Sequence, residues 1–132
     1  MLDNDSFENL VKANTFASYN GITIRQMGPG KAEAALTVGP DHRNPYGKLH
    51  GGAYYTLADC AAGTACRTDG RKYVTLDGTI HFIRAAEHGV VTASAQVRHC
   101  GRTTALAYVN ITGEDGTLYA TGEYTFFCVA ES

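Results

Sequence analysis

The sequence predicts an α+β domain in which an antiparallel sheet of five or six strands wraps around one long central helix, with a short helix near the N-terminus. Two observations lead to this prediction. The segment from residue 51 to about residue 67 is rich in alanine and other small residues and lacks strand alternation. Two segments of alternating apolar and polar residues precede it, and four follow it. Small side chains allow a sheet to pack closely around a helix that is buried on nearly all sides.

The first element predicted is a short amphipathic helix over residues 6–17. Ser6 is the candidate N-cap, because its hydroxyl can accept a hydrogen bond from the first turn. Apolar residues follow at roughly helical spacing, namely Phe7, Leu10, Val11 and Ala17.

A β-hairpin and a loop are predicted next. Residues 22–25 and 32–38 both alternate between apolar and polar side chains, and the Gly-Pro-Gly sequence at 28–30 is typical of the turn between two strands. Residues 39–50 carry no apolar period and contain two prolines, so we expect a loop before the central helix.

Four further strands are predicted after the central helix. Each has one apolar face, as an antiparallel sheet covered on one side requires. The apolar positions are Val74, Leu76, Ile80 and Phe82; Val91, Ala93, Ala95 and Val97; Ala105, Ala107, Val109 and Ile111; and Leu118, Ala120, Tyr124, Phe126 and Cys128.

Length and composition limit the classes of function. With 132 residues the chain has room for one domain, 1–132. A net charge of -2 argues against nucleic acid as a partner, and no apolar run approaches the length of a membrane span. The acidic, polar N-terminus is unlike a secretory or mitochondrial leader, so we expect a cytoplasmic protein. Four cysteines without a CxxC pair predict buried, reduced thiols and no metal site.

The segment 44–59, NPYGKLHGGAYYTLAD, carries the chemistry. A helix that begins near Gly51 has unpaired backbone N–H groups in its first turn, where the helix dipole attracts negative charge. Glycine at 51 and 52 leaves these donors open to a carbonyl oxygen that becomes an oxyanion. The alternative is that the two glycines only permit close packing.

Asp59 lies in the middle of this apolar helix. A buried carboxylate without a partner is costly, so Asp59 is either paired or functional. None of the residues three or four positions away is a cation, which weakens the pairing explanation.

The spacing of Gly51 and Asp59 predicts a dimer. Eight residues of helix separate them by about 12 Å along the axis. A base must approach within about 3 Å of the group that it activates, or act through one water. One helix therefore does not easily supply both the donor and the base to one bond. Two antiparallel helices across a two-fold axis would place Gly51 of one chain against Asp59 of the other.

These residues also carry a resemblance to a known family. The HGG at 50–52 after Asn44 and Gly47, followed by LAD at 57–59, resembles the signature of the PaaI-like (phenylacetate-degradation) branch of hotdog-fold acyl-CoA thioesterases. VTLD at 74–77, FIR at 82–84, GRT at 101–103 and DG at 115–116 are similar in order and spacing, so the resemblance covers residues 20–128. It implies a hotdog fold and hydrolysis of an acyl-CoA without a cofactor. We expect a homodimer at minimum, and the choice between this dimer and a homotetramer built as a dimer of dimers stays open.

The resemblance implies a role at each matching position. Asp59 would be the general base that activates water, or a nucleophile toward the thioester. The Gly51 amide would polarise the carbonyl with help from Asn44. His50 would hold the loop or contact the leaving sulfur, and Thr75 would orient Asp59 or its water. Plainer roles stay open: Asn44 as an Asx turn, His50 as a helix cap, Thr75 as an ordinary strand residue.

Substrate contacts are predicted at four further positions. Gly52 and Tyr55 lie in the first turns of the central helix, and Arg84 and Arg102 are candidates for the coenzyme A phosphates. The acyl group stays open between a small aryl group and a medium-length chain.

Two other functions fit the same fold. A hotdog-type hydroxyacyl thioester dehydratase or hydratase needs a His that cooperates with a carboxylate, and no His lies one or two turns from Asp59 on the helix. A non-catalytic acyl-CoA-binding or oligomerisation module would not need Asp59, Asn44 and the glycines together.

Overall fold

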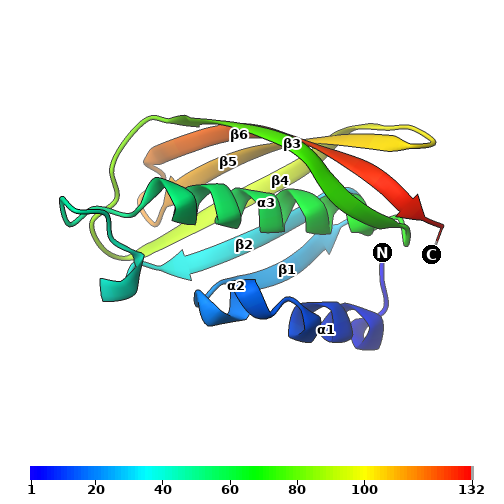
Figure 1. The fold of residues 1–132 in the computed structure, drawn as a ribbon, viewed down its shortest axis with the longest axis horizontal. Helices are drawn as coiled ribbons and strands as arrows, with labels where there is room; N and C mark the ends of the chain where they lie inside the picture. The colour runs from blue at the N-terminus through cyan, green and yellow to red at the C-terminus, as the bar shows by residue number, and fades with distance from the viewer. Residues whose placement is uncertain (132) are drawn as a thin grey trace.

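The structure is a computed structural model, and it describes residues 1–131. Six antiparallel strands form one sheet in the order β1-β2-β4-β5-β6-β3, and the sheet curves around the long helix α3 (Figure 1). The predicted α+β architecture with six strands around one helix is therefore confirmed. The strands are β1 (Thr23–Gly28), β2 (Lys31–Thr37), β3 (Lys72–Phe82), β4 (Val90–Cys100), β5 (Thr104–Gly113) and β6 (Leu118–Ala130).

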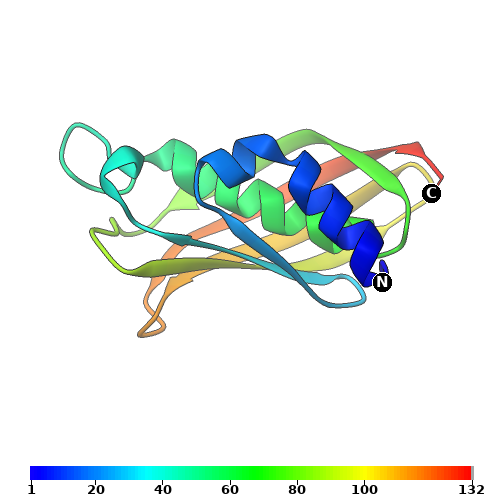
Figure 2. The ribbon, with the colours of Figure 1, turned by 90° about the horizontal axis from the view of Figure 1, so that it is seen from below.

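Helix α3 (Gly51–Arg67) forms the centre of the core. Its second half presents alanines and Gly63, whose small side chains let α3 contact all six strands. The sheet supplies the large core side chains, among them Leu36, Val91, Ile111, Tyr124 and Phe126. One face of α3 is left uncovered by the sheet, between β3 and the N-terminal helices (Figures 1 and 2). The candidate site lies on this face.

The predicted N-terminal helix is two helices rather than one. Helix α1 (Asn4–Ala13) and helix α2 (Thr15–Tyr19) meet at Asn14, whose side chain accepts a hydrogen bond from Ala17 N and caps α2. The predicted N-cap is also wrong, because the side chain of Asp3 caps α1 and accepts hydrogen bonds from Ser6. The predicted loop before α3 contains one short 3-10 helix (Pro40–His42).

The predicted apolar face of β3 is also partly wrong. The pairing of β3 with β6 shifts between Thr75 and Asp77, so β3 contains a β-bulge at Leu76. A bulge reverses which alternate residues face the core. Tyr73 is therefore buried, whereas Val74 and Leu76 are 49% and 56% exposed.

The prediction for the cysteines holds for two of the four. Cys60 and Cys66 are buried in α3, but Cys100 is exposed and Cys128 is half-buried, because both lie at strand ends beyond the cover of α3. All four are free thiols. Within residues 1–131, no helix combines the length and apolarity that a membrane crossing requires.

Candidate active site

Asp59 lies on the uncovered face of α3 and contacts β3. The Thr75 hydroxyl donates a hydrogen bond of 2.7 Å to one carboxylate oxygen of Asp59. The bulge at Leu76 makes this contact possible, because it turns Thr75 rather than Leu76 toward α3. Asp59 is half-buried and Thr75 is exposed, so the pair remains accessible in the single chain.

The surroundings of Asp59 raise its pKa above the ordinary value. Burial is the main cause, and the Thr75 hydrogen bond and the charge of Arg67 oppose it. A carboxylate with a raised pKa is a stronger base than an exposed one. This environment suits a group that accepts a proton from water near neutral pH.

The first turn of α3 has one occupied glycine amide and one open one. His50 is the N-cap, and its Nδ1 accepts a hydrogen bond of 2.8 Å from the Gly52 amide. The predicted opening of both donors is therefore wrong for Gly52. No acceptor is found for the Gly51 amide among residues 1–131. Gly51 is thus the donor that can meet a substrate carbonyl.

Asn44 shapes the loop that precedes α3. Its side-chain oxygen accepts hydrogen bonds from Tyr46 N at 2.9 Å and Lys48 N at 3.0 Å, which is an Asx turn. The amide nitrogen of the same side chain has no partner among the described residues. Asn44 can therefore hold the loop and still donate a hydrogen bond to a ligand.

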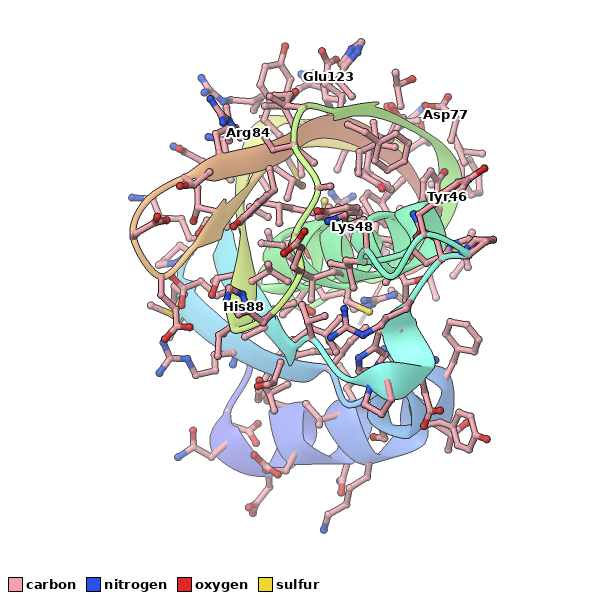
Figure 3. All side chains as sticks on the ribbon, turned by 90° about the vertical axis from the view of Figure 1, so that its left-hand side faces the viewer. Tyr46, Lys48, Asp77, Arg84, His88 and Glu123 are labelled. Atoms are coloured by element: carbon pink, nitrogen blue, oxygen red, sulfur yellow. The ribbon has the colours of Figure 1, made fainter. Side chains whose placement is uncertain are left out.

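A groove of about 280 Å³ brings Asn44, Gly51 and Arg84 together, with Phe82 and Tyr54 in its walls. Figure 3 views this end of the molecule, with Lys48 on the loop in front of α3 and Arg84 on the segment after β3. The Tyr54 hydroxyl fixes that segment, because it donates to Arg84 O and accepts from Ala86 N. The groove therefore has defined walls around the open amide.

The other two predicted contacts lie apart from this groove. Tyr55 packs edge-on against Tyr124, with 5.2 Å between ring centroids, and its hydroxyl donates to Gly78 O beneath β3. Arg102 lies in the β4–β5 turn, where its carbonyl accepts from Arg71 beside the C-terminal end of α3. Arg84 and Arg102 are therefore at opposite ends of one chain.

Gly51 and Asp59 also remain apart within one chain. Both belong to the continuous helix α3, so they are about 12 Å apart along its axis. The groove at Gly51 includes neither Asp59 nor Thr75. The single chain thus presents two half-sites, one with the donor and one with the carboxylate.

Known proteins with similar sequences point to one family. The model of the Thioesterase superfamily matches residues 46–120. The acyl-coenzyme A thioesterase PaaI of Escherichia coli (strain K12) is 37% identical over 95 residues, which are 71% of this chain and 68% of that protein. The acyl-coenzyme A thioesterase 13 of Homo sapiens is 33% identical over 121 residues, 88% of this chain and 86% of the human protein.

The chain belongs to the thioesterase superfamily. The structure of the E. coli PaaI protein from the phenylacetic acid degradation operon matches with a TM-score of 0.89 and 28% identity, over 95% of this chain and 91% of that one. A hypothetical thioesterase protein from Streptococcus pneumoniae TIGR4, solved with coenzyme A, gives a TM-score of 0.79 and 30% identity, over 83% of this chain and 87% of that one. The predicted PaaI-like hotdog fold and the prediction of a thioester hydrolase are confirmed.

One residue of the candidate site in this thioesterase, Arg67, was not predicted from the sequence. Arg67 opposes the rise in the pKa of Asp59, but it is eight positions away, beyond the helical neighbours considered. Long side chains point toward the helix N-terminus, which brings Arg67 back toward Gly63. That direction was the available signal.

Proposed function

We propose that this thioesterase hydrolyses acyl-coenzyme A thioesters, with a small aryl or medium-chain acyl group, in sites formed between two subunits. The observation that carries the proposal is the pair of half-sites on α3. Asp59 with Thr75 lies at mid-helix, and the open Gly51 amide lies at the helix start. Similar proteins named acyl-coenzyme A thioesterases support the substrate class.

In the proposed reaction, Asp59 takes a proton from a water molecule as the water oxygen attacks the thioester carbon. The carbonyl oxygen becomes an oxyanion, which the partner's Gly51 amide and Asn44 side chain stabilise by hydrogen bonds. Collapse of the tetrahedral intermediate breaks the carbon–sulfur bond. The proton on Asp59 passes to the leaving thiolate, which gives the free acid and coenzyme A. The reaction needs no cofactor.

The exposed edge of the sheet supports a dimer. Strand β3 is an edge strand with β6 as its only neighbour in the described sheet, and its outer residues Val74 and Leu76 are exposed. Phe82 and Ile83 are also about half exposed at its end. Unpaired strand edges and exposed apolar residues favour pairing with another chain. Pairing of two β3 edges would place the uncovered faces of two α3 helices together.

An antiparallel arrangement of the two α3 helices would also bring the two predicted coenzyme A contacts, Arg84 and Arg102, to one site. Arg84 lies at the start of α3 and Arg102 near its end, so a two-fold axis across α3 would bring Arg84 of one subunit toward Arg102 of the other. Both guanidinium groups could then approach the phosphates of one coenzyme A.

The test is thiol release from phenylacetyl-, butanoyl- and octanoyl-coenzyme A by the wild-type protein and by Asp59→Ala. We expect the wild type to hydrolyse at least one of them and Asp59→Ala to lose about a thousandfold in kcat, the scale of general-base catalysis. Equal activity of both proteins would refute the role of Asp59. Inactivity of the wild type on every acyl group would favour a binding module instead.

A further inference from the structure

Helix α1 is amphipathic, but its apolar face is only partly buried. Phe7, Leu10 and Val11 lie on one side of the helix, and no residue of α1 is buried. Leu10 remains 45% exposed. A surface helix normally buries such a stripe against the core. The apolar face of α1 instead lies over a hollow.

The hollow has a volume of about 320 Å³. Its roof is the apolar face of α1, one wall is Ile24 of β1, and its floor is Thr64 and Arg67 of α3. Pockets of this size with mostly apolar walls and a few polar groups are typical of small-molecule sites. Figure 2 shows α1 and α2 side by side with α3 on the face away from the sheet.

Helix α1 is tied to the rest of the chain at its two ends. On one side, Leu2 exchanges two hydrogen bonds of 3.0 Å with the side chain of Gln26 on β1. On the other, the Asn14 side chain contacts Cys60 of α3 at 4.0 Å. Within residues 1–131, no hydrogen bond joins α1 itself to the sheet or to α3 between these points. The roof can therefore adjust to what lies beneath it.

The hollow lies further along α3 than the carboxylate of the proposed site, and Asp59 does not line it. Cys60 adjoins Asp59, and Thr64 and Arg67 follow about 7 and 12 Å further along the helix axis. The Arg67 guanidinium donates to Tyr73 O at 3.3 Å, two residues before Thr75 on β3. Arg67 therefore borders both the hollow and the Asp59–Thr75 pair.

We propose that the hollow beneath α1 holds the tail of the acyl group and that the preferred substrates carry a medium-length straight chain. This inference rests on the proposed function. A phenylacetyl ring would end about one helical turn from the carbonyl, whereas an octanoyl chain would reach between one and two turns, to Thr64. The apolar face of α1 would be buried by such a chain.

The test compares kcat/KM for butanoyl-, hexanoyl-, octanoyl- and decanoyl-coenzyme A. For the wild type, we expect a rise of about fourfold per methylene up to octanoyl, the factor for burying one methylene. Val11→Trp fills the hollow and should lower the ratio of octanoyl to butanoyl activity at least tenfold. Asn9→Trp adds the same bulk to the exposed side of α1 and should leave the ratio unchanged.

Binding of S-octyl- and S-butyl-coenzyme A, thioethers that cannot be hydrolysed, separates this inference from the proposed function. Calorimetry should show tighter binding of the octyl compound to the wild type and loss of that preference in Val11→Trp. This result without hydrolysis of any acyl-coenzyme A would refute the function and keep the pocket. If both tryptophan variants hydrolyse acyl-coenzyme A with the same dependence on chain length, the pocket is refuted. The pocket is also refuted if Val11→Trp changes its oligomeric state and still shows the wild-type dependence of kcat/KM on chain length.

Discussion

At the scale of single residues, burial raises the pKa of the proposed base and the Thr75–Asp59 hydrogen bond limits that rise. Thr75→Val should raise the pKa of Asp59 further, so the acidic limb of the kcat/KM profile should move to higher pH. Thr75→Ser keeps the hydroxyl and should restore the wild-type limb. Superimposable profiles for all three proteins would show that Thr75 is an ordinary strand residue.

The raised pKa of Asp59 also predicts a stability cost. An unfolded Asp titrates near 3.9. Between that value and the higher folded pKa, the folded chain binds more protons, so this group's contribution to stability falls as pH rises through the window. Asp59→Asn removes the cost above the window and can keep the Thr75 bond. We expect the free energy of unfolding of Asp59→Asn at pH 7, measured by urea denaturation, to exceed that of the wild type by about 1 kcal/mol. This is a typical gain when a residue at a functional site is replaced.

Asp77→Asn is the matched control for that gain, because Asp77 is an exposed carboxylate on β3, the strand that carries Thr75 (Figure 3). Its free energy of unfolding should stay within about 0.5 kcal/mol of the wild type. A destabilised Asp59→Asn would mean that the charge of Asp59 is better stabilised in the fold than its burial indicates.

At the scale of elements, the start of α3 depends on the cap that His50 provides. His50→Ala removes the acceptor of the Gly52 amide and should lower the free energy of unfolding by about 1 kcal/mol, whereas His50→Asn offers another good N-cap and should recover part of it. Urea denaturation measures both, with an unchanged m-value expected. Equal stability of all three proteins would exclude a capping role.

The sequence predicted elements best where local pattern and packing agree. The bounds of α3 followed from a long run of small residues between an N-terminal glycine pair and Asp69-Gly70. The bulge at Leu76 was not predicted, because it depends on pairing with β6, about 50 residues further along the chain. Asn14 was read as helical, although a side chain that caps the next turn can also end a helix.

The same distinction applies to the candidate site. The spacing of Gly51 and Asp59 follows from helix geometry alone, so their separation was predictable. The hydrogen bond that occupies the Gly52 amide was not predictable, because it depends on the side-chain rotamer of His50. The contact of Thr75 with Asp59 was implied only by resemblance, since its physical cause is the bulge.

At the scale of the whole molecule, the proposed shared site requires that the β3 edge pairs with a second copy. Leu76→Glu places a charge on this edge and should yield monomers in analytical ultracentrifugation. Circular dichroism should show unchanged secondary structure, and the activity should fall at least hundredfold. Tyr19→Glu changes an apolar residue that is 92% exposed on α2 and should leave assembly and activity unchanged. Active monomers of Leu76→Glu would contradict the shared site.

Complementation between two inactive variants tests the shared site most directly. Gly51→Pro removes the amide hydrogen while fitting the first position of a helix, and His50 already has the extended backbone that precedes proline. Gly51→Ala, which adds a similar contact with Phe82 but keeps the amide, is the control. Differently tagged Asp59→Ala and Gly51→Pro chains are co-expressed, and heterodimers are purified through both tags. One of their two sites would join an intact Asp59 to an intact Gly51 amide, so they should recover about half of the wild-type activity. Heterodimers that are as inactive as the Asp59→Ala and Gly51→Pro homodimers would contradict the shared site.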